Sequence, residues 1–404
     1  MKHYLKSMAL GGFLVLSCCN PHTTQGGGHV VAWGAGRFIG PLSDDTNRGQ
    51  SMVPQTLTNA SLLAGGWRHS IALDSNGTLF SWGDDSLGAL DFPTNNAGGY
   101  RSISCGEQHS IAISTNGTVL AAGFDLFHQT DIPAHLSKVV AIAAGFYHNL
   151  ALRSDGTVVA WGGSADYSPG GDPNYGQSVV PTGLSNVVAV AAGGWHSLAL
   201  RSDGTVVGWG RNDYQQVGIP PGLTNVIAIA AGAAHSLILR GDGKVLAWGL
   251  NTYGQTNIPA NLSGVIRIAA GGWHNLALRT NGTVISWGAG SSGGPASVSF
   301  GQNTVPLGLS NVVQIACGLF HSLAVVASPT PSNTTGPVEL LLAADRCTVG
   351  FPGEMGKVYR IQYTDSIRDL NWQALPLTTG VESRMHLTDP SPPRGQRFYR
   401  LQSW

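Results

Sequence analysis

The sequence predicts an all-β fold: a seven-bladed β-propeller closed by N- and C-terminal strands, followed by a small β-sandwich-like module. A repeat of about 40 residues, the usual length of a propeller blade, predicts the first part. Each copy has one half that reads Ala-Gly-x-x-His-Ser-Leu and one half that ends in Trp-Gly. The first Trp-Gly has no histidine half before it, and the last histidine half has no Trp-Gly after it. These two unpaired halves complete each other, as they would in a ring.

One histidine and one tryptophan mark each repeat. The histidines are His69, His109, His148, His196, His235, His274 and His321. The second halves end at Trp33, Trp82, Ala122, Trp161, Trp209, Trp248 and Trp287, so one copy has lost its tryptophan. A binding or catalytic site is made once, whereas these residues recur in every blade. We therefore expect the histidines to be structural and to hydrogen-bond loop backbone, with no metal site, and the tryptophans to pack between blades.

Four short strands are expected in each repeat. In the fourth copy, residues 186–192, 196–201 and 205–209 are runs rich in Val, Leu and Ala. Asp203-Gly204 separates the last two runs and is typical of a two-residue hairpin. A Gln-x-x-x-Pro segment follows the second half of six copies, and the remaining copy has Ala89 before Pro93. The segment is expected to form the outer strand, because proline cannot donate to a strand ladder.

The N-terminus, residues 1–18, resembles a signal peptide. Lys2 and Lys6 precede an apolar stretch at residues 8–16, which is too short to span a membrane. The run Val-Leu-Ser-Cys ending at Cys18 resembles a bacterial lipobox, although an ordinary cleavage site would look similar. We expect an exported bacterial protein, either an envelope lipoprotein with lipid on Cys18 or an extracellular protein.

Three further segments follow from composition and periodicity. The propeller occupies residues 29–326, and a linker rich in Pro, Ser and Thr occupies residues 327–336. Residues 337–404 show short alternating strands with turn residues between them and form the C-terminal module.

Charge and motifs exclude several classes of function. The formal net charge is zero, so nothing predicts binding to nucleic acid or to an anionic membrane surface. The sequence has no nucleophile elbow, phosphate-binding glycine loop or metal-binding HExxH motif. We therefore expect no enzyme activity and no cofactor.

The fifth copy carries a family resemblance. It reads Val226-x-x-Ile229-Ala-Ala-Gly-x-x-His235-Ser-Leu, continues through an Asp-Gly turn to Trp248-Gly, and then has Gly-Gln255. This pattern resembles the regulator of chromosome condensation repeat and recurs over residues 29–326. The resemblance implies a seven-bladed propeller closed by strands from both termini.

Two branches of that family imply different functions. The nuclear founder is an exchange factor for a small GTPase and contacts chromatin. A secreted bacterial member inhibits β-lactamases through an aromatic-rich face. The signal peptide and the outer segments make this chain resemble the secreted branch more closely, although fold alone transfers no activity.

Function is expected where the copies differ. The loop before each histidine and the loop after each Trp-Gly emerge on the same face, because antiparallel strands alternate direction. Long loops at residues 35–49, 162–176 and 289–301 join it. Many of its side chains are aromatic, as is typical of protein-binding surfaces. The residues predicted to contact a partner protein are Trp67, Arg68, Phe146, Tyr147, Trp195, Tyr214, Tyr253, Trp273 and Phe320.

Three alternatives remain open. The same aromatic face, or the C-terminal module, could bind a glycan by stacking on sugar rings. An enzyme would need carboxylates on this face, and Asp84, Asp85 and Asp125 are the candidates, although they are also typical turn residues. A role in nucleotide exchange is the least favoured, because export removes the protein from cytosolic GTPases.

Overall fold

A computed structural model provides the fold. It describes residues 28–37, 47–93, 98–163, 174–289 and 299–327, together with short strands between residues 339 and 403. The predicted signal peptide with Cys18 lies outside the described residues, as do most of the three long loops and of the linker.

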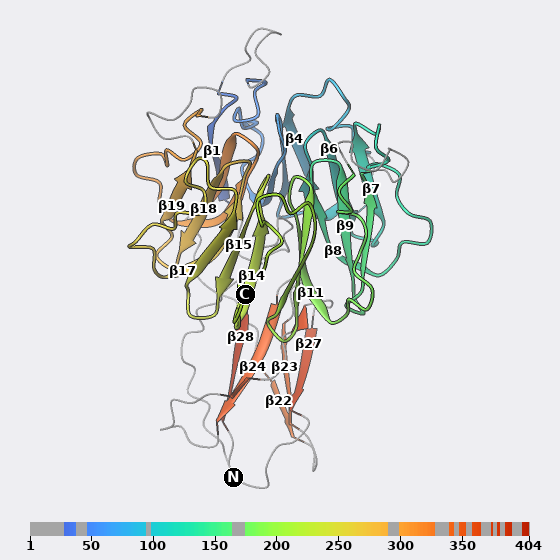
Figure 1. Cartoon of the computed structure of the whole chain (residues 1–404), viewed down its shortest axis with the longest axis vertical. Coiled ribbons are helices and arrows are strands. Elements are labelled where there is room, and N and C mark those ends of the chain that lie inside the picture. Colours follow the sequence, from blue (N-terminus) through green and yellow to red (C-terminus); the bar gives the residue numbers. More distant parts are fainter. Residues whose placement is uncertain are drawn as a thin grey trace.

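The described part of the propeller consists of three-stranded antiparallel blades that lie side by side (Figure 1), and two of them are joined into one six-stranded sheet by the pairing of Gly28 with Ala60. We number the blades in the order of their histidines. The strands of the first four blades are β2 (Ala60–Gly65), β3 (His69–Asp74) and β4 (Leu79–Gly83); β5 (Tyr100–Cys105), β6 (His109–Ser114) and β7 (Val119–Gly123); β8 (Val139–Ala144), β9 (His148–Arg153) and β10 (Val158–Gly162); and β11 (Val187–Ala192), β12 (His196–Arg201) and β13 (Val206–Gly210).

The last three blades follow the same plan. Their strands are β14 (Val226–Ala231), β15 (His235–Arg240) and β16 (Val245–Gly249); β17 (Val265–Ala270), β18 (His274–Arg279) and β19 (Val284–Gly288); and β20 (Val312–Cys317), β21 (His321–Ala327) and β1 (Gly28–Gly34).

The seventh blade joins the two ends of the propeller sequence. β1 pairs antiparallel with β21, from Gly28 opposite Ala327 to Gly34 opposite His321. Trp33 lies opposite Ser322, the same register that Trp209 and Ser197 have in the fourth blade. The two unpaired halves of the sequence therefore form one blade, as predicted.

The predicted fourth strand is wrong for the described residues. Each Gln-x-x-x-Pro segment begins in a turn or bend and continues without regular secondary structure, as from Gln216 to Pro220. The glutamine side chain is completely buried in all six copies that have it. The glutamine Oε1 accepts the backbone N–H of the residue two positions before the segment and so holds the turn that leads into it. The Asp-Gly and Asn-Gly hairpins are confirmed, and their glycines all have positive φ.

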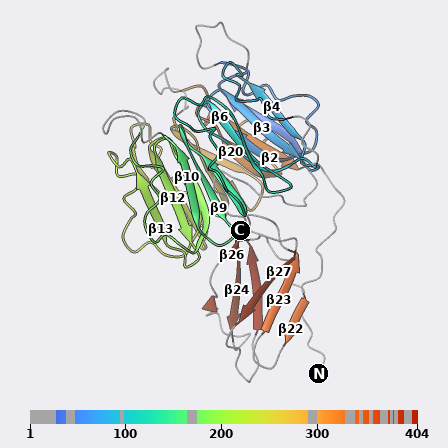
Figure 2. The ribbon, with the colours of Figure 1, turned by 90° about the vertical axis from the view of Figure 1, so that its right-hand side faces the viewer.

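The middle strand of each blade carries the core. In β12 the first five residues, from His196 to Leu200, are buried, because neighbouring blades cover both faces of the strand. Leu198 and Leu200 pack on the side of the fifth blade, whereas Ala199 packs on the side of the third. Alternate residues of a strand face opposite ways, so the Leu-Ala-Leu pattern gives this middle strand one bulky side and one small side. Neighbouring blades lie side by side (Figure 2).

The C-terminal strands form two small antiparallel sheets. One contains β22 (Glu339–Leu342), β23 (Cys347–Pro352) and β27 (Arg384–Asp389), and the other contains β24 (Val358–Thr364), β25 (Gln373–Ala374), β26 (Thr378–Thr379) and β28 (Phe398–Ser403). Among the residues that the structure describes, no helix could cross a membrane.

Candidate functional site

The repeat histidines connect each blade to the next. Every histidine Nε2 lies 2.8 to 3.0 Å from a Ser or Asn side chain at the position that follows the next repeat histidine. The seven pairs are His69–Ser110, His109–Asn149, His148–Ser197, His196–Ser236, His235–Asn275, His274–Ser322 and His321–Ser70. The last pair returns to the first blade, so the series is an unbroken cycle. The Nε2 atoms bond to side chains of the neighbouring blade and not, as expected, to loop backbone.

The chemistry of the partner fixes the histidine tautomer. Asn149 Oδ1 can only accept, and the Ser197 hydroxyl already donates to the Gln177 carbonyl at 2.9 Å. Nε2 of each histidine facing such a group must therefore carry the hydrogen and donate it. Nδ1 is left without a proton. Ser and Asn are interchangeable here because each accepts from histidine and donates to the glutamine carbonyl.

Burial makes these imidazoles hard to protonate. Burial lowers the pKa of His69, His109 and His235 to about 4 and that of the other four to about 3. Within the described part of the chain, the Nδ1 atoms of six of the seven have no hydrogen-bond partner. A proton added there would be buried and unpaired. This arrangement is opposite to that of a proton-transfer histidine, whose pKa lies close to the working pH.

The glycine three residues before each histidine makes room for the ring. A Cβ on Gly232 would lie 2.1 Å from His235 Cε1, and the other six copies are similar. The Ala-Gly-x-x-His motif is therefore a steric requirement of the imidazole.

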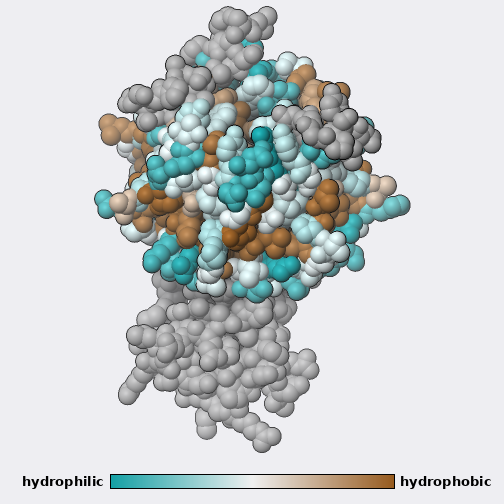
Figure 3. All heavy atoms as spheres, viewed as in Figure 1, coloured by the Kyte–Doolittle hydropathy of each residue, from teal (hydrophilic) through white to brown (hydrophobic). Residues whose placement is uncertain are grey.

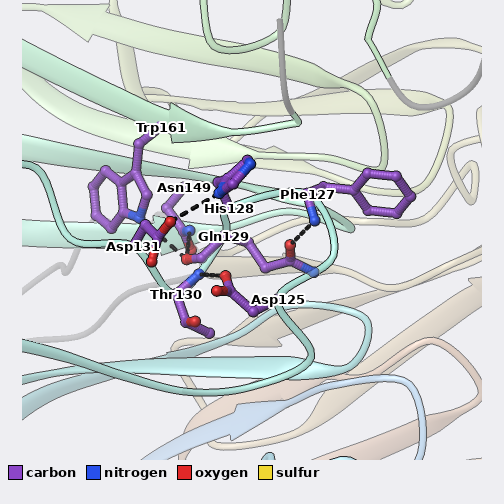
Figure 4. Close-up of polar contacts among 8 residues, drawn as sticks. All are labelled: Asp125, Phe127, His128, Gln129, Thr130, Asp131, Asn149 and Trp161. Atoms are coloured by element: carbon purple, nitrogen blue, oxygen red, sulfur yellow. Dashed lines mark hydrogen bonds and ion pairs between the residues drawn. The ribbon is translucent and has the colours of Figure 1, made fainter. Parts of the chain in front are cut away.

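The buried glutamine organises the outer loops (Figure 4). The Gln129 carbonyl accepts hydrogen bonds from Asn149 Nδ2 at 2.7 Å and from Trp161 Nε1 at 3.1 Å. Its side-chain Oε1 accepts the backbone N–H of Phe127 at 2.9 Å. Six glutamines make this last bond to the residue two positions earlier, which is Arg48, Phe127, Tyr175, Tyr214, Tyr253 or Phe300. Five of these six are aromatic, so the glutamine fixes the turn that presents an aromatic side chain.

The second blade lacks both members of this arrangement. Ala122 replaces the tryptophan, and Ala89 occupies the place of the glutamine, with its Cα 3.2 Å from a Cβ placed on Gly123. The Ser110 hydroxyl has no such carbonyl and lies 3.8 Å from Cys105 Sγ instead. The two replacements occur in the same blade, at positions where in other blades the tryptophan Nε1 donates to the backbone carbonyl of the glutamine.

A run of aromatic side chains crosses the second, third and fourth blades. The rings meet edge to face in the order Phe124, Phe127, Tyr147, Phe146, Trp195 and Tyr175, with centroids 4.8 to 6.4 Å apart. The Arg211 guanidinium continues the run. It lies 4.6 Å from the centre of the Tyr175 ring, 5.1 Å from that of Trp195 and 6.0 Å from that of Tyr214. We call these eight residues the long aromatic arc.

A second group spans the sixth and seventh blades. Trp273 stacks on Phe320 at 5.2 Å, Phe300 meets Phe320 edge to face at 5.1 Å, and Tyr253 meets Trp273 at 6.2 Å. We call these four residues the short aromatic arc. Their contacts cover one face of Trp273, and Arg211 covers part of Trp195. Such contacts reduce the free ring surface on which a sugar could stack.

The side chains nearest the propeller axis have a packing role. Phe146 lies against Gly194, with ring carbons 3.1 and 3.2 Å from a Cβ placed there, and Leu319 lies against Gly272. Seven bulky side chains cannot converge on one axis, so some copies must be small. The variation two residues before each histidine therefore comes partly from packing and does not all mark a binding surface.

Backbone hydrogen bonds tie the same loops together. Phe146 N donates to Gly194 O, Ala233 N to Gly272 O, and Leu319 N to Gly66 O. The central cavity beneath them measures about 80 Å³ and is lined mainly by Gly and Ala. That volume is far below the several hundred Å³ typical of small-molecule sites. This face therefore presents a rigid surface and not a deep pocket.

The nine predicted contact residues divide by exposure. Trp67, Arg68, Phe146, Tyr147, Trp195, Tyr253 and Trp273 are partly exposed, Tyr214 is 44% exposed, and Phe320 is 6% exposed. Phe320 therefore supports the rings above it. Arg68 lies over Trp67, 3.7 Å from its ring centre, and pairs with Asp84 at 3.5 Å.

Sequence reasoning missed Phe124, Phe127, Tyr175 and Phe300. All but Phe124 stand two residues before the buried glutamine. Comparing the copies at that offset would have found these three.

The three candidate carboxylates accept hydrogen bonds from backbone N–H groups within turns. Asp85 Oδ1 accepts Leu90 N at 2.8 Å, and Asp125 Oδ1 accepts Thr130 N at 2.7 Å. Asn212 and Asn251 make the same bond five residues ahead in other blades. Hydrogen bonds from Ser86 and the charge of Arg68 lower the pKa of Asp84, in spite of partial burial that acts to raise it. No group of His, Cys, Asp and Glu able to hold a metal ion occurs within the described ranges.

Comparison with known proteins identifies the repeat. The regulator of chromosome condensation (RCC1) repeat matches residues 61–89, 100–129, 139–167, 187–216, 226–255 and 265–293. The chain therefore belongs to the family of propellers built from this repeat. No curated protein sequence matches it significantly.

Solved structures share the fold at low sequence identity. Prp20p from Saccharomyces cerevisiae, described with its binding to Gsp1p and histones, is 22% identical with a TM-score of 0.59, covering 79% of this chain and 94% of its own. Human WBSCR16 is 20% identical with a TM-score of 0.56, covering 74% and 100%. The ectodomain of the Physcomitrella patens receptor kinase CR4 is 17% identical with a TM-score of 0.53, covering 70% and 76%.

Proposed function

We propose that this propeller is a non-catalytic binding protein that recognises a partner protein through the two aromatic arcs. The long arc is the observation that carries the proposal. It places aromatic side chains and one arginine in mutual contact on loops held by buried glutamines and by interblade hydrogen bonds. Trp, Tyr and Arg dominate the energetics of protein interfaces, and a rigid surface loses little entropy on binding.

Outside the two aromatic arcs, few apolar regions offer an alternative surface for binding a protein. On the side of the molecule seen in Figure 3, apolar patches are small and separated by polar residues. Exposed apolar side chains elsewhere, such as Val179 and Leu307, lie singly on connectors between blades. Scattered residues of this kind are normal for a protein surface.

Interaction with proteins is also known for a structural relative. Prp20p is described as binding Gsp1p and histones. For this chain we propose only the general role, because the likeness extends to the fold and not to particular surface residues.

The test compares matched variants in partner capture. A Trp195→Ala, Trp273→Ala double variant removes one ring from each arc, and a Tyr214→Ala variant removes the most exposed arc residue with little risk to folding. A Val179→Ala, Leu307→Ala double variant is the control. Partners crosslinked to the wild type are purified, and their affinity for each variant is then measured.

We expect the first double variant to weaken binding by about tenfold or more, and the control to change it by less than about twofold. Equal affinities for the wild type and for both arc variants would rule out this face. Capture of polysaccharide in place of protein would favour the glycan alternative.

We further propose that the chain is exported and carries lipid on Cys18. The lysines and apolar stretch before this residue support the proposal, and the adjacent Cys19 provides a matched control. Metabolic labelling with a fatty acid is expected to label the wild type and Cys19→Ser but not Cys18→Ser. Label retained in Cys18→Ser would exclude that anchor, and a cytoplasmic location of the unlabelled chain would exclude export.

A further inference from the structure

Three hairpin turns of the propeller share the triplet Asn-Gly-Thr. They begin at Asn76, Asn116 and Asn281, and the glycines that follow have φ of 79°, 91° and 76°. An asparagine before glycine is chemically vulnerable, because the glycine nitrogen can attack the side-chain carbonyl without hindrance from a Cβ. Three copies of one triplet in one backbone shape make a natural comparison.

The attacking nitrogens make the same hydrogen bond, although Gly77 is buried and Gly117 and Gly282 are partly exposed. Each glycine N–H donates to the carbonyl two residues before the asparagine, and the bonds are Gly77 to Asp74 at 3.1 Å, Gly117 to Ser114 at 2.9 Å and Gly282 to Arg279 at 3.0 Å. The hydrogen bonds of the asparagine side chains, in contrast, differ between the three turns.

Two of those side chains are held in place. Asn116 Oδ1 accepts hydrogen bonds from Thr118 N, at 3.0 Å, and from the Ser114 hydroxyl. Asn281 Oδ1 accepts hydrogen bonds from Thr283 N at 3.1 Å and from the Thr283 hydroxyl at 2.7 Å. Each carbonyl would have to leave two donors before its carbon could turn toward the glycine nitrogen.

The third side chain is exposed and makes no hydrogen bond among the described residues. The reason is Asp74, whose Oδ1 accepts both Asn76 N and Thr78 N at 2.8 Å. Thr78 N is the donor that would otherwise hold Asn76. In the sixth blade the position of Asp74 is occupied by Arg279, and Thr283 N is left for Asn281.

We propose that Asn76 is a selective deamidation site. Gly77 N forms a bond to Asn76 Cγ, the bond from Cγ to Nδ2 breaks, and ammonia leaves with the proton lost by the nitrogen. Water then opens the cyclic imide at either carbonyl and gives aspartate or isoaspartate. No oxidant or cofactor is consumed. Freedom of the side chain to reach the attack geometry sets the rate.

The two products differ in their effect on the fold. Aspartate fits this turn, because Asp155 and Asp203 occupy it in the third and fourth blades and accept the threonine N–H. Isoaspartate adds a backbone carbon between the hairpin strands. Gly77 O accepts Tyr100 N at 2.8 Å, so the added carbon would disturb the start of β5 in the neighbouring blade.

The test measures the conversion of each asparagine separately. The full chain is incubated at mildly alkaline pH in its folded state and in denaturant, and peptides containing each site are quantified by mass spectrometry. Each hydrogen bond that must break slows conversion by about fivefold, so folded Asn76 should convert about 25-fold faster than the other two. In denaturant the three rates should agree within about twofold, because the triplets are identical. Equal rates in the folded chain, or a slower Asn76, would overturn the proposal.

A substitution tests the cause. Asp74→Arg introduces the residue that stands at this position in the sixth blade and frees Thr78 N to hold Asn76. The conversion of Asn76 should then fall by about fivefold, while Asn116 in the same molecule keeps its rate. An unchanged Asn76 rate would show that Asp74 does not control the site. If the variant unfolds, the rates of Asn76 and Asn116 become equal, and Asp74→Ser, which introduces the residue of the second blade, replaces it.

Discussion

Acid is expected to unfold the propeller through its seven buried histidines. The ordinary pKa of histidine is 6.5, and burial lowers the pKa of these seven to about 3 or 4 in the folded chain. Between these values the unfolded state binds protons that the folded state does not. Stability is therefore complete above the unfolded pKa and falls as the pH drops through it, until the folded histidines titrate.

The magnitude follows from that difference. Between pH 7 and pH 6 each histidine lowers the free energy of unfolding by about 0.7 kcal/mol, and seven lower it by about 5 kcal/mol. At pH 5 the total loss reaches about 13 kcal/mol, which is comparable with the whole stability of a typical domain. The propeller should therefore unfold well above pH 3.

Urea unfolding followed by tryptophan fluorescence at a series of pH values measures this effect. Near pH 6 the slope of the free energy of unfolding should correspond to uptake of about five protons, because unfolded histidines are then about three-quarters protonated. A His196→Gln variant keeps a side-chain donor for Ser236 but cannot titrate, and its slope should fall by one seventh. A slope of one proton or fewer would refute the view that all seven imidazoles are buried in the neutral form.

Two further predictions test the interblade contacts. Gly232→Ala should lower the free energy of unfolding by about 3 kcal/mol or more, because its Cβ would lie 2.1 Å from His235 Cε1. Gly222→Ala is the control. A Cβ there has no atom within 4 Å, so this variant should lower the free energy of unfolding by only about 1 kcal/mol, because of the positive φ of Gly222. Similar losses in the two variants, measured by urea unfolding, would contradict the steric account. Asn149→Ala should cost about 1 to 3 kcal/mol, because it leaves the His109 donor buried and unpaired, and Asn149→Ser should recover most of that loss. If serine is no better than alanine, the shared role of Ser and Asn is wrong.

Much of the architecture could be predicted from repetition. The His196 and Trp209 halves recur at a fixed distance, so the strands, the hairpins and the pairing of β1 with β21 followed from spacing. The Gln-x-x-x-Pro segment was misread as a strand. Its turns depend on a glutamine side chain that bonds to the backbone two residues earlier, and strand propensity has no term for such a bond.

The candidate site was predictable only in part. Tyr214 and Tyr253 were recognised as surface aromatics, but Tyr175 and Phe300 at the same repeat position were not. Phe146 and Phe320 were assigned to the surface because their positions vary between copies. Near the propeller axis the copies must differ in side-chain size, because seven identical bulky side chains would not fit there. Variation between copies at such positions therefore need not mark a binding surface.

By itself, the sequence determined the number of blades, the histidine and tryptophan positions, and which blade is assembled from both ends of the propeller. These properties depend on local patterns repeated along the chain. Only the tertiary structure decided that each histidine bonds to the next blade, that the aromatic residues form two arcs, and that Asn76 alone of its three copies is unrestrained. Each of these depends on side chains that meet across blades or compete for one backbone donor, and chain spacing does not encode such encounters.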